Sequence, residues 1–286
     1  MPSALSLLKR LYVQLPVIRE LRSLRALLAQ DRAHHEEFVR RLLCQERYAS
    51  SKCLNRYERR IFSQNGEDGI LQEVFRRIGG GDHLFLEIGV DGPENNTTYL
   101  LTQGWRGYWI EGDRRSVARI RRAFREPLAA GQLTLLQSVV TMKNLCGSLR
   151  RLEVPAEIDL LSLDVDRNTY WILAAALPVV RPRVLVVEYN AIYPPEIEWK
   201  VQYDDARWWN RTSYFGASLK AYESLCRAYG LSLVGCDLAG VDAFFVRQDL
   251  CGDRFEEPFT AETHYEPPRY YLGEDGYPRC FSDLAD

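Results

Sequence analysis

The sequence lacks the paired cysteines, the charge bias and the long apolar runs that mark several classes of protein. Its seven cysteines are dispersed and form no C-x-x-C pair, which argues against a disulfide framework or a zinc cluster and favours a reducing, cytoplasmic setting. No apolar run approaches the roughly 18 residues of a membrane span, and no signal-peptide pattern is recognisable. The formal net charge is −2 without a long run of one sign, so nucleic acid is not expected as a partner.

Short apolar runs alternate with amphipathic stretches along most of the chain, which indicates an α/β fold. The runs at 84–88, 108–110, 133–139, 158–163 and 184–187 have the continuous apolar character of strands that are covered on both faces. Two further runs, 231–234 and 241–246, are close enough in sequence to form a hairpin. Strands that alternate with helices in this way predict a mostly parallel sheet with right-handed crossovers.

The stretch from 83 to 113 has the pattern of a strand, a glycine-bearing turn, a short helix and a second strand. Gly89 and Gly92 follow the first strand and allow the backbone to approach a ligand closely. The second strand ends at Glu111, about 20 positions beyond the turn, where β-α-β nucleotide sites place the acidic residue that binds ribose. A third fingerprint glycine is absent, which disfavours a nicotinamide-dependent oxidoreductase.

The acidic-x-Gly-x-x-Gly pattern from Glu87 to Gly92 resembles motif I of the S-adenosylmethionine (SAM)-dependent methyltransferases. Several segments also resemble the FkbM-type methyltransferase family, notably S-Q-x-G-E-D-G at 63–69, Y-F-G-A-S-L-K at 214–220 and G-V-D-A-F-F-V at 240–246. In this family a glycine commonly follows D-x-D, whereas Arg167 stands in that place here. The similar segments are 63–71, 85–113, 158–168, 184–195 and 214–247.

This resemblance implies a seven-stranded, doubly wound, mostly parallel sheet whose last strand is antiparallel, with a helical extension at the N-terminus. It divides the chain into that extension (1–58), a SAM-methyltransferase-like α/β domain (59–250) and a C-terminal tail packed on the domain (251–286). It further implies SAM as cofactor and methyl transfer to a hydroxyl, often of a sugar in a glycan or glycolipid. A non-catalytic methyltransferase-like scaffold is the alternative from another class of function.

Four acidic residues end predicted strands and should converge at one edge of the sheet, because ligands of open α/β sheets bind beyond the carboxyl ends of the strands. These residues are Glu87, Glu111, Asp164 and Glu188. Glu111 suits the ribose hydroxyls of the cofactor. The full set expected around SAM is Gln64, Glu87, Gly89, Asp91, Gly92, Asn96, Glu111, Asp113 and Ser138.

Two devices could activate the acceptor hydroxyl, and the sequence leaves both open. None of the four histidines follows a predicted strand, so none is placed as a general base. Asp164, Glu188 and Asn190 offer oxygen ligands of the kind that Mg²⁺ or Mn²⁺ accepts, and a bound metal would acidify the hydroxyl. In the alternative, Asp164 or Asp166 accepts the proton directly, with Lys220 as a weaker candidate.

The interval from 191 to 214 is rich in aromatic residues and has no helix or strand period. Trp208, Trp209 and Tyr214 offer flat faces that suit the ring of a small-molecule or glycan acceptor, although aromatic residues also serve as ordinary core.

The N-terminal residues 1–47 have an amphipathic helical pattern with leucines on one face and basic residues on the other. Such a helix suits three roles: packing on its own domain or on a second copy of the chain, binding a partner helix, or peripheral binding at the inner face of an anionic membrane. The first role is the ordinary expectation for an amphipathic helix and includes a homo-oligomer.

Overall fold

The computed structural model describes residues 16–272. Its contacts divide the chain into two compact units, Met1–Ala49 and Ser50–Asp286. Residues 50–58, which the sequence assigned to the helical extension, thus belong to the second unit. That unit also includes the described part of the tail.

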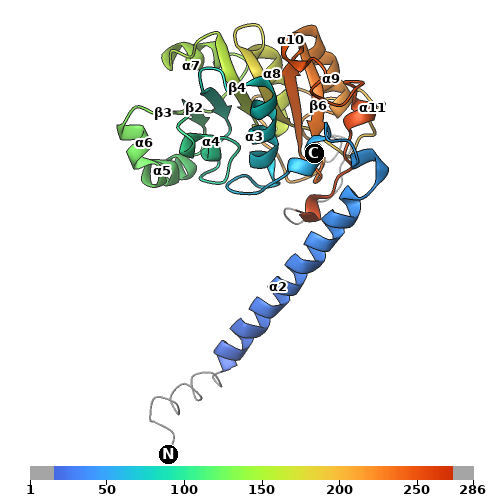
Figure 1. Ribbon diagram of the computed structural model, residues 1–286. Coiled ribbons are helices and arrows are strands. Elements are labelled where there is room, and N and C mark those ends of the chain that lie inside the picture. Colours follow the sequence, from blue (N-terminus) through green and yellow to red (C-terminus); the bar gives the residue numbers. More distant parts are fainter. Residues whose placement is uncertain (1–15, 273–286) are drawn as a thin grey trace, which may run out of the picture. The chain divides into compact units, whose positions relative to one another are not determined.

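The second unit is built on one seven-stranded sheet with the order β3-β2-β1-β4-β5-β7-β6 (Figure 1). Strands β1 to β5 are parallel, whereas β7 is antiparallel to both of its neighbours, β5 and β6. The predicted mixed sheet with an antiparallel last strand is therefore confirmed. The strands are β1 (Leu84–Ile88), β2 (Arg106–Glu111), β3 (Leu133–Gln137), β4 (Glu157–Leu163), β5 (Arg181–Glu188), β6 (Leu231–Cys236) and β7 (Asp242–Arg247).

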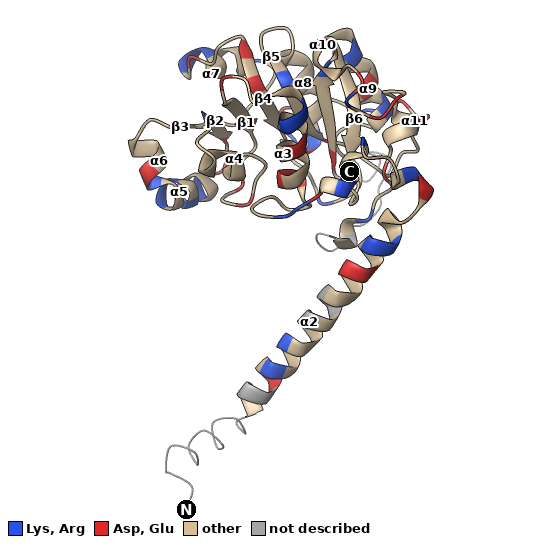
Figure 2. Cartoon of the chain, in the orientation of Figure 1, with Lys and Arg blue, Asp and Glu red and all other residues tan. Residues whose placement is uncertain are grey.

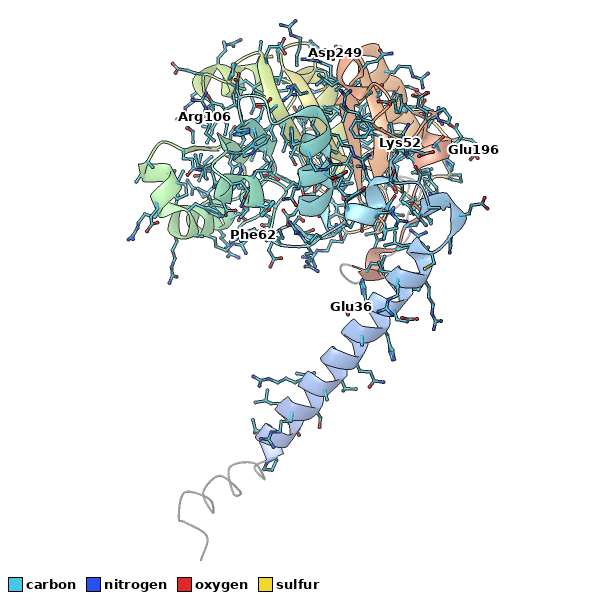
Figure 3. The ribbon with its side chains drawn as sticks, viewed as in Figure 1. Glu36, Lys52, Phe62, Arg106, Glu196 and Asp249 are labelled. Atoms are coloured by element: carbon cyan, nitrogen blue, oxygen red, sulfur yellow. The ribbon has the colours of Figure 1, made fainter. Side chains whose placement is uncertain are left out.

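Helices cover both faces of this sheet and bury two separate apolar cores. All five residues of β1 are buried, and successive residues such as Phe85 and Leu86 belong to opposite cores, because side chains alternate between the faces of a strand. The helices of this unit are drawn with their side chains in Figure 3. They are α3 (Glu67–Ile78), α4 (Thr98–Thr102), α5 (Arg114–Ala123), α6 (Arg125–Ala129), α7 (Leu145–Arg151), α8 (Thr169–Ala176), α9 (Leu219–Ala228), α10 (Gln248–Cys251) and α11 (Ala261–His264).

Short 3₁₀ turns and irregular segments connect these elements. The turns are η1 (Glu46–Tyr48), η2 (Leu54–Tyr57), η3 (Asp166–Asn168) and η4 (Tyr270–Leu272). The long interval between β5 and α9 contains no helix or strand, as its composition predicts, and one isolated bridge joins Lys200 to Ala217.

The first unit is described from Pro16 onward and contains the helix α2 (Pro16–Leu43). Val17, Leu21, Leu24 and Leu27 are exposed, and the helix contains both basic and acidic residues (Figure 2). The part of the predicted amphipathic pattern that falls on residues 1–15 lies outside the described residues. Among residues 16–272, no helix combines the length and apolarity of a membrane span. Contact with a membrane, a partner helix or a second copy stays a prediction.

Candidate active site

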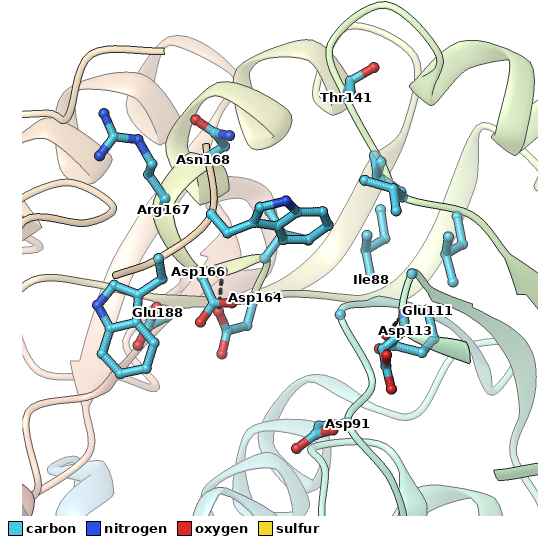
Figure 4. Close-up of a pocket in the computed structure, with 18 of the residues that line it drawn as sticks. Ile88, Asp91, Glu111, Asp113, Thr141, Asp164, Asp166, Arg167, Asn168 and Glu188 are labelled. Atoms are coloured by element: carbon cyan, nitrogen blue, oxygen red, sulfur yellow. Dashed lines mark hydrogen bonds between the residues drawn. The ribbon is translucent and has the colours of Figure 1, made fainter. Parts of the chain in front are cut away.

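A cavity of about 1250 Å³ opens at the carboxyl edge of the parallel strands. Two groups of acids face each other across it (Figure 4): Glu111 and Asp113 on one side, and Asp164, Asp166 and Glu188 on the other, with Ile88 between them. Other residues that line it include Gln64, Asn65, Gly89, Asp91, Arg114, Arg115, Ser138, Thr141, Arg167, Asn168, Asp205, Arg207, Trp208, Trp209, Arg211 and Val241.

Gly89 is the point where the loop after β1 touches the loop after β4. Its φ is +89°, and a Cβ at this position would overlap the backbone carbonyl oxygen of Asp164. Since only glycine avoids both the overlap and the strain of a left-handed backbone, this residue keeps the two halves of the cavity in contact.

Glu87 and Asn96, both predicted to bind the cofactor, do not line the cavity. Glu87 is buried at the end of β1 and accepts hydrogen bonds from the backbone N–H of Asn96 (3.1 Å), the Ser162 hydroxyl (3.3 Å) and the Thr97 hydroxyl. Burial raises its pKa to about 7. The side-chain amide of Asn96 donates to Asp242 Oδ2 at 3.2 Å. The two residues therefore hold the loop after β1 in place without lining the cavity themselves.

Gly92 is also outside the cavity lining, and its carbonyl accepts a hydrogen bond from the side-chain amide of Asn95 at 2.7 Å. By contrast, five of the predicted cofactor residues do line the cavity in addition to Gly89. These are Gln64, Asp91, Glu111, Asp113 and Ser138.

The carboxylates near the end of β2 differ in their environment. Glu111 is largely buried and accepts the backbone N–H of Asp113 at 2.5 Å; burial raises the pKa of its carboxyl. Asp113 caps α5 by accepting the Ser116 N–H at 2.8 Å, and that hydrogen bond lowers its pKa. Asp91 is exposed and pairs with Arg119 at 2.9 Å. Among these three acids, Glu111 is thus the one that is largely buried and still lines the cavity.

Asp164, Asp166 and Glu188, named here the cavity acids, form the opposite wall. Asp164 Oδ1 accepts the Asp166 N–H at 3.1 Å. Asp164 and Asp166 reach the solvent of the cavity, yet protein surrounds them on the other sides. This desolvation raises the pKa of all three, and that of Asp166 lies at about 7, helped by the charges of Asp164, Asp91 and Glu111.

The backbone at this wall accommodates Arg167 without a left-handed conformation at that residue. The positive φ, +56°, falls instead on Asp166, one position earlier. The Arg167 side chain is buried, donates to the Gln202 carbonyl at 3.4 Å and lies 5.1 Å from the centre of the Tyr214 ring. It anchors the irregular interval 191–218 beside the cavity acids.

The predicted metal ligands do not fit a metal ion. Asn190 is fully buried and outside the cavity lining; its amide donates to the carbonyls of Ser213 (2.7 Å) and Phe215 (2.9 Å), and its oxygen accepts the Ile192 N–H at 3.4 Å. Only Asp164 and Glu188 of that set reach the cavity.

Elsewhere in residues 16–272, three other carboxylates bring oxygens within 4.8 Å of one another. They are Glu67, Asp237 and Asp242, named here the buried acids. Their oxygens accept hydrogen bonds from Asn65, Val241, Asn96 and the backbone of Asp242 itself. The chain's own donors thus occupy this group.

The remaining predicted residues divide between the cavity and the body of the protein. Trp208, with 67% of its surface exposed, and Trp209 line the cavity. Tyr214 lies outside the lining and packs against Trp199, with ring centres 5.4 Å apart. Lys220 is paired with Glu223 (3.1 Å) and Glu262 (2.8 Å) on α9 and α11, away from the cavity.

The sequence interpretation missed Arg207 and Arg211, which line the cavity next to the tryptophans. Both come from the irregular interval, where no helix or strand period indicates a direction for a side chain. Their position on either side of the two tryptophans in the sequence was the available signal.

Comparison with solved structures finds similar chains, and the three described below have TM-scores of 0.40 or lower. An O-methyltransferase from Bacillus cereus in complex with SAH is 17% identical, covers 61% of this chain and 79% of its own, and has a TM-score of 0.40. A putative O-methyltransferase from Klebsiella pneumoniae is 18% identical, with 61% and 78% covered and a TM-score of 0.38. Magnesium protoporphyrin IX methyltransferase from Synechocystis with bound SAM is 14% identical, with 63% and 79% covered and a TM-score of 0.38.

No protein-family model and no curated protein matches the sequence. The fold is established by the sheet itself. Its order, β3-β2-β1-β4-β5-β7-β6, and the single antiparallel strand β7 are those of the class I SAM-dependent methyltransferase fold.

Proposed function

We propose that the chain is a SAM-dependent O-methyltransferase. One observation carries this proposal: a single cavity holds Glu111 at the end of β2 on one wall and Asp166, a carboxyl with a pKa of about 7, on the other. The cavity volume of about 1250 Å³ exceeds the roughly 300–1,000 Å³ of common ligand pockets, so it has room for a cofactor and an acceptor together.

The donor half is formed by the loops after β1, β2 and β3. Glu111 would accept hydrogen bonds from the two ribose hydroxyls, because a carboxylate offers two acceptor oxygens. Gly89 permits close approach of the methionine part, with Gln64 beside it. Ser138 would lie near the adenine. SAM supplies an electrophilic methyl group on a positively charged sulfonium, whose charge suits a wall of carboxylates.

In the acceptor half, Asp166 is the group that we assign as general base. It reaches the cavity solvent, and its pKa of about 7 is close to the value at which a base is both deprotonated and strong enough at neutral pH. As the acceptor oxygen attacks the methyl group, Asp166 takes up the hydroxyl proton. Asp164 and Glu188 line the same wall of the cavity, and burial raises the pKa of both carboxyl groups. Because Asn190 faces away, no metal step is proposed.

The acceptor that we propose is a sugar hydroxyl, as the resemblance to FkbM-type enzymes implies. The exposed face of Trp208 suits the C–H face of a sugar ring. Gln64 of the S-Q-x-G-E-D-G motif, and Asn65 at its variable position, line the same cavity.

Calorimetric titration with SAH and with NAD tests the proposal. SAH should bind and NAD should not, and Glu111→Ala should weaken SAH binding about 10- to 100-fold, as expected when hydrogen bonds to a charged acceptor are lost. Glu126→Ala, an exposed change on α6 away from the cavity, is the matched control. Binding of NAD in preference to SAH contradicts the proposal. Binding of SAH without methyl transfer from SAM to any glycan would favour the scaffold function.

A further inference from the structure

The segment 204–212 contributes side chains to the lining of the cavity and is fixed to the rest of the domain. The side-chain amide of Asn168 donates to the Asp204 carbonyl at 2.8 Å, and Lys143 pairs with Asp205 at 2.9 Å. The Trp209 indole N–H donates to the Thr212 carbonyl at 2.6 Å. Side chains of this segment that line the cavity therefore have a defined position relative to Asp166.

Arg211 stands in this segment at a backbone position that is costly for an arginine. Its φ is +61°, a left-handed conformation that glycine adopts without strain and that other residues adopt only when the surroundings impose it. Asn210 Oδ1 accepts hydrogen bonds from the Thr212 N–H (3.3 Å) and the Thr212 hydroxyl (2.6 Å), which fixes this turn. The turn thus places an arginine at the cavity, in a backbone conformation that glycine would adopt with less strain.

The guanidinium of Arg211 is exposed at the cavity and has no hydrogen bond or ion pair with the residues that the structure describes. Arg207, four residues earlier in the sequence, also lines the cavity and lies 3.3 Å from Asp204. A neutral acceptor would leave the charge of Arg211 without a partner, whereas a planar guanidinium matches the paired oxygens of a phosphate or carboxylate.

The acceptor half therefore combines two kinds of side chain. The cavity acids, among which Asp166 would take a proton, and the arginines of the 204–212 segment line the same cavity, together with the exposed Trp208 of that segment. We infer that the acceptor is an anionic sugar, in which a ring packs on Trp208, one hydroxyl faces Asp166, and a phosphate or carboxylate binds Arg211. This inference rests on the proposed function, since it assigns the substrate class of the same cavity.

The test is equilibrium binding of matched sugars to the full chain saturated with SAH. The probes are glucose, glucuronic acid, glucose 1-phosphate and UDP-glucose, which share one ring and differ in the anionic group. At least one anionic probe should bind tenfold or more tightly than glucose. Preference for glucuronic acid identifies a carboxylate as the anion, and preference for glucose 1-phosphate or UDP-glucose identifies a phosphate. Equal binding of all four probes, or no binding by any, overturns the inference.

Substitutions of Arg211 then separate the effect of its charge on binding from any effect on folding. Arg211→Gln should remove the preference for the anionic probe, while Arg211→Lys, which keeps the charge and loses the fork of donors, should retain part of it. Arg211→Gly removes the side chain at a position that glycine suits, so it should lose the preference with no loss of folding stability. Arg122→Gln, an exposed change on α5 outside the cavity, should change nothing. A preference that survives in Arg211→Gln contradicts the assignment.

Failure of this inference is distinguishable from failure of the proposed function. If SAH does not bind at all, the methyltransferase proposal itself fails. If SAH binds normally to wild type and to all Arg211 variants but the anionic probes show no advantage, only the acceptor class is wrong.

Discussion

The cavity acids and the buried acids are two clusters of carboxylates in one domain. A ligand in the cavity can reach the first cluster but not the second. Asp164 and Asp166 reach the solvent of the cavity. Glu67, Asp237 and Asp242 are each less than a tenth exposed, and their oxygens accept hydrogen bonds from the chain's own backbone and side chains.

A raised pKa does not distinguish the two groups. Burial raises the pKa of Asp166 to about 7 and raises those of Asp237 and Asp242 well above their usual range. What differs is whether an acceptor can touch the carboxyl. A perturbed pKa therefore indicates a catalytic residue only together with access from a cavity. This comparison supports the proposal that the cavity acids take part in the reaction and that the buried acids do not.

Asp166→Asn should produce the largest effect, because the amide cannot accept the acceptor's proton. General-base catalysis contributes about 10²- to 10⁴-fold, so kcat should fall at least about 100-fold, with SAH affinity within about twofold of wild type. Turnover is measured with SAM and the best-binding sugar. Asp205→Asn, which also removes a carboxylate from the cavity lining, is the control and should retain most activity. An equal loss in both variants would mean that charge, rather than proton transfer, matters.

The pH profile of kcat/KM should show the next largest effect. Asp166 acts in its deprotonated form, so activity should rise with pH, with an inflection near 7 where its carboxyl titrates. Below the inflection the rate should fall about tenfold per pH unit. The inflection should disappear in Asp166→Asn and persist in Asp242→Asn. Its persistence near pH 7 in Asp166→Asn would assign the titration to another group, for which Glu87, with a pKa of about 7, is the candidate.

The sheet was predictable from the sequence because its strands are covered on both faces. A run such as Leu84–Ile88 needs no partner information to be recognised as a buried strand. Position after a strand likewise predicted that Glu111, Asp164 and Glu188 would meet at one edge. These predictions depend on local pattern and on the rule for parallel sheets.

The direction of each side chain at that edge was not predictable, because distant segments determine it. Asn190 follows β5 but turns toward the carbonyls of Ser213 and Phe215, more than 20 positions along the chain. Glu87 ends β1 but is covered by the returning loop at Thr97. Arg211 reaches the cavity through an irregular turn that has no period in the sequence.

Asn96→Ala should have a smaller effect, confined to stability. The Asn96 amide donates to Asp242 Oδ2 at 3.2 Å and to the Ser162 hydroxyl at 3.3 Å, so its loss removes a donor from the buried acids. Losing a hydrogen bond to a buried polar group costs about 1–3 kcal/mol in the free energy of unfolding, measured by chemical denaturation. Gln103→Ala, an exposed change at the end of α4, is the control. An unchanged free energy of unfolding would show that the buried acids do not need this donor.

The smallest effect is expected for Asp242→Asn, and it lies in the pH dependence of stability. Since burial raises the pKa of Asp242 in the folded state, while the unfolded chain titrates near about 3.9, the folded state binds more protons above that pH. Wild-type stability should therefore decrease as pH rises from about 4 through the folded-state pKa. Asp242→Asn removes one contribution, so its Tm should decline less steeply than that of wild type between pH 5 and 8. A difference of about 1 kcal/mol corresponds to roughly 2–4 °C for a domain of this size. Parallel Tm curves for the two proteins would show that Asp242 carries its charge in the folded state at neutral pH, as would be expected if a cation accompanied the buried acids.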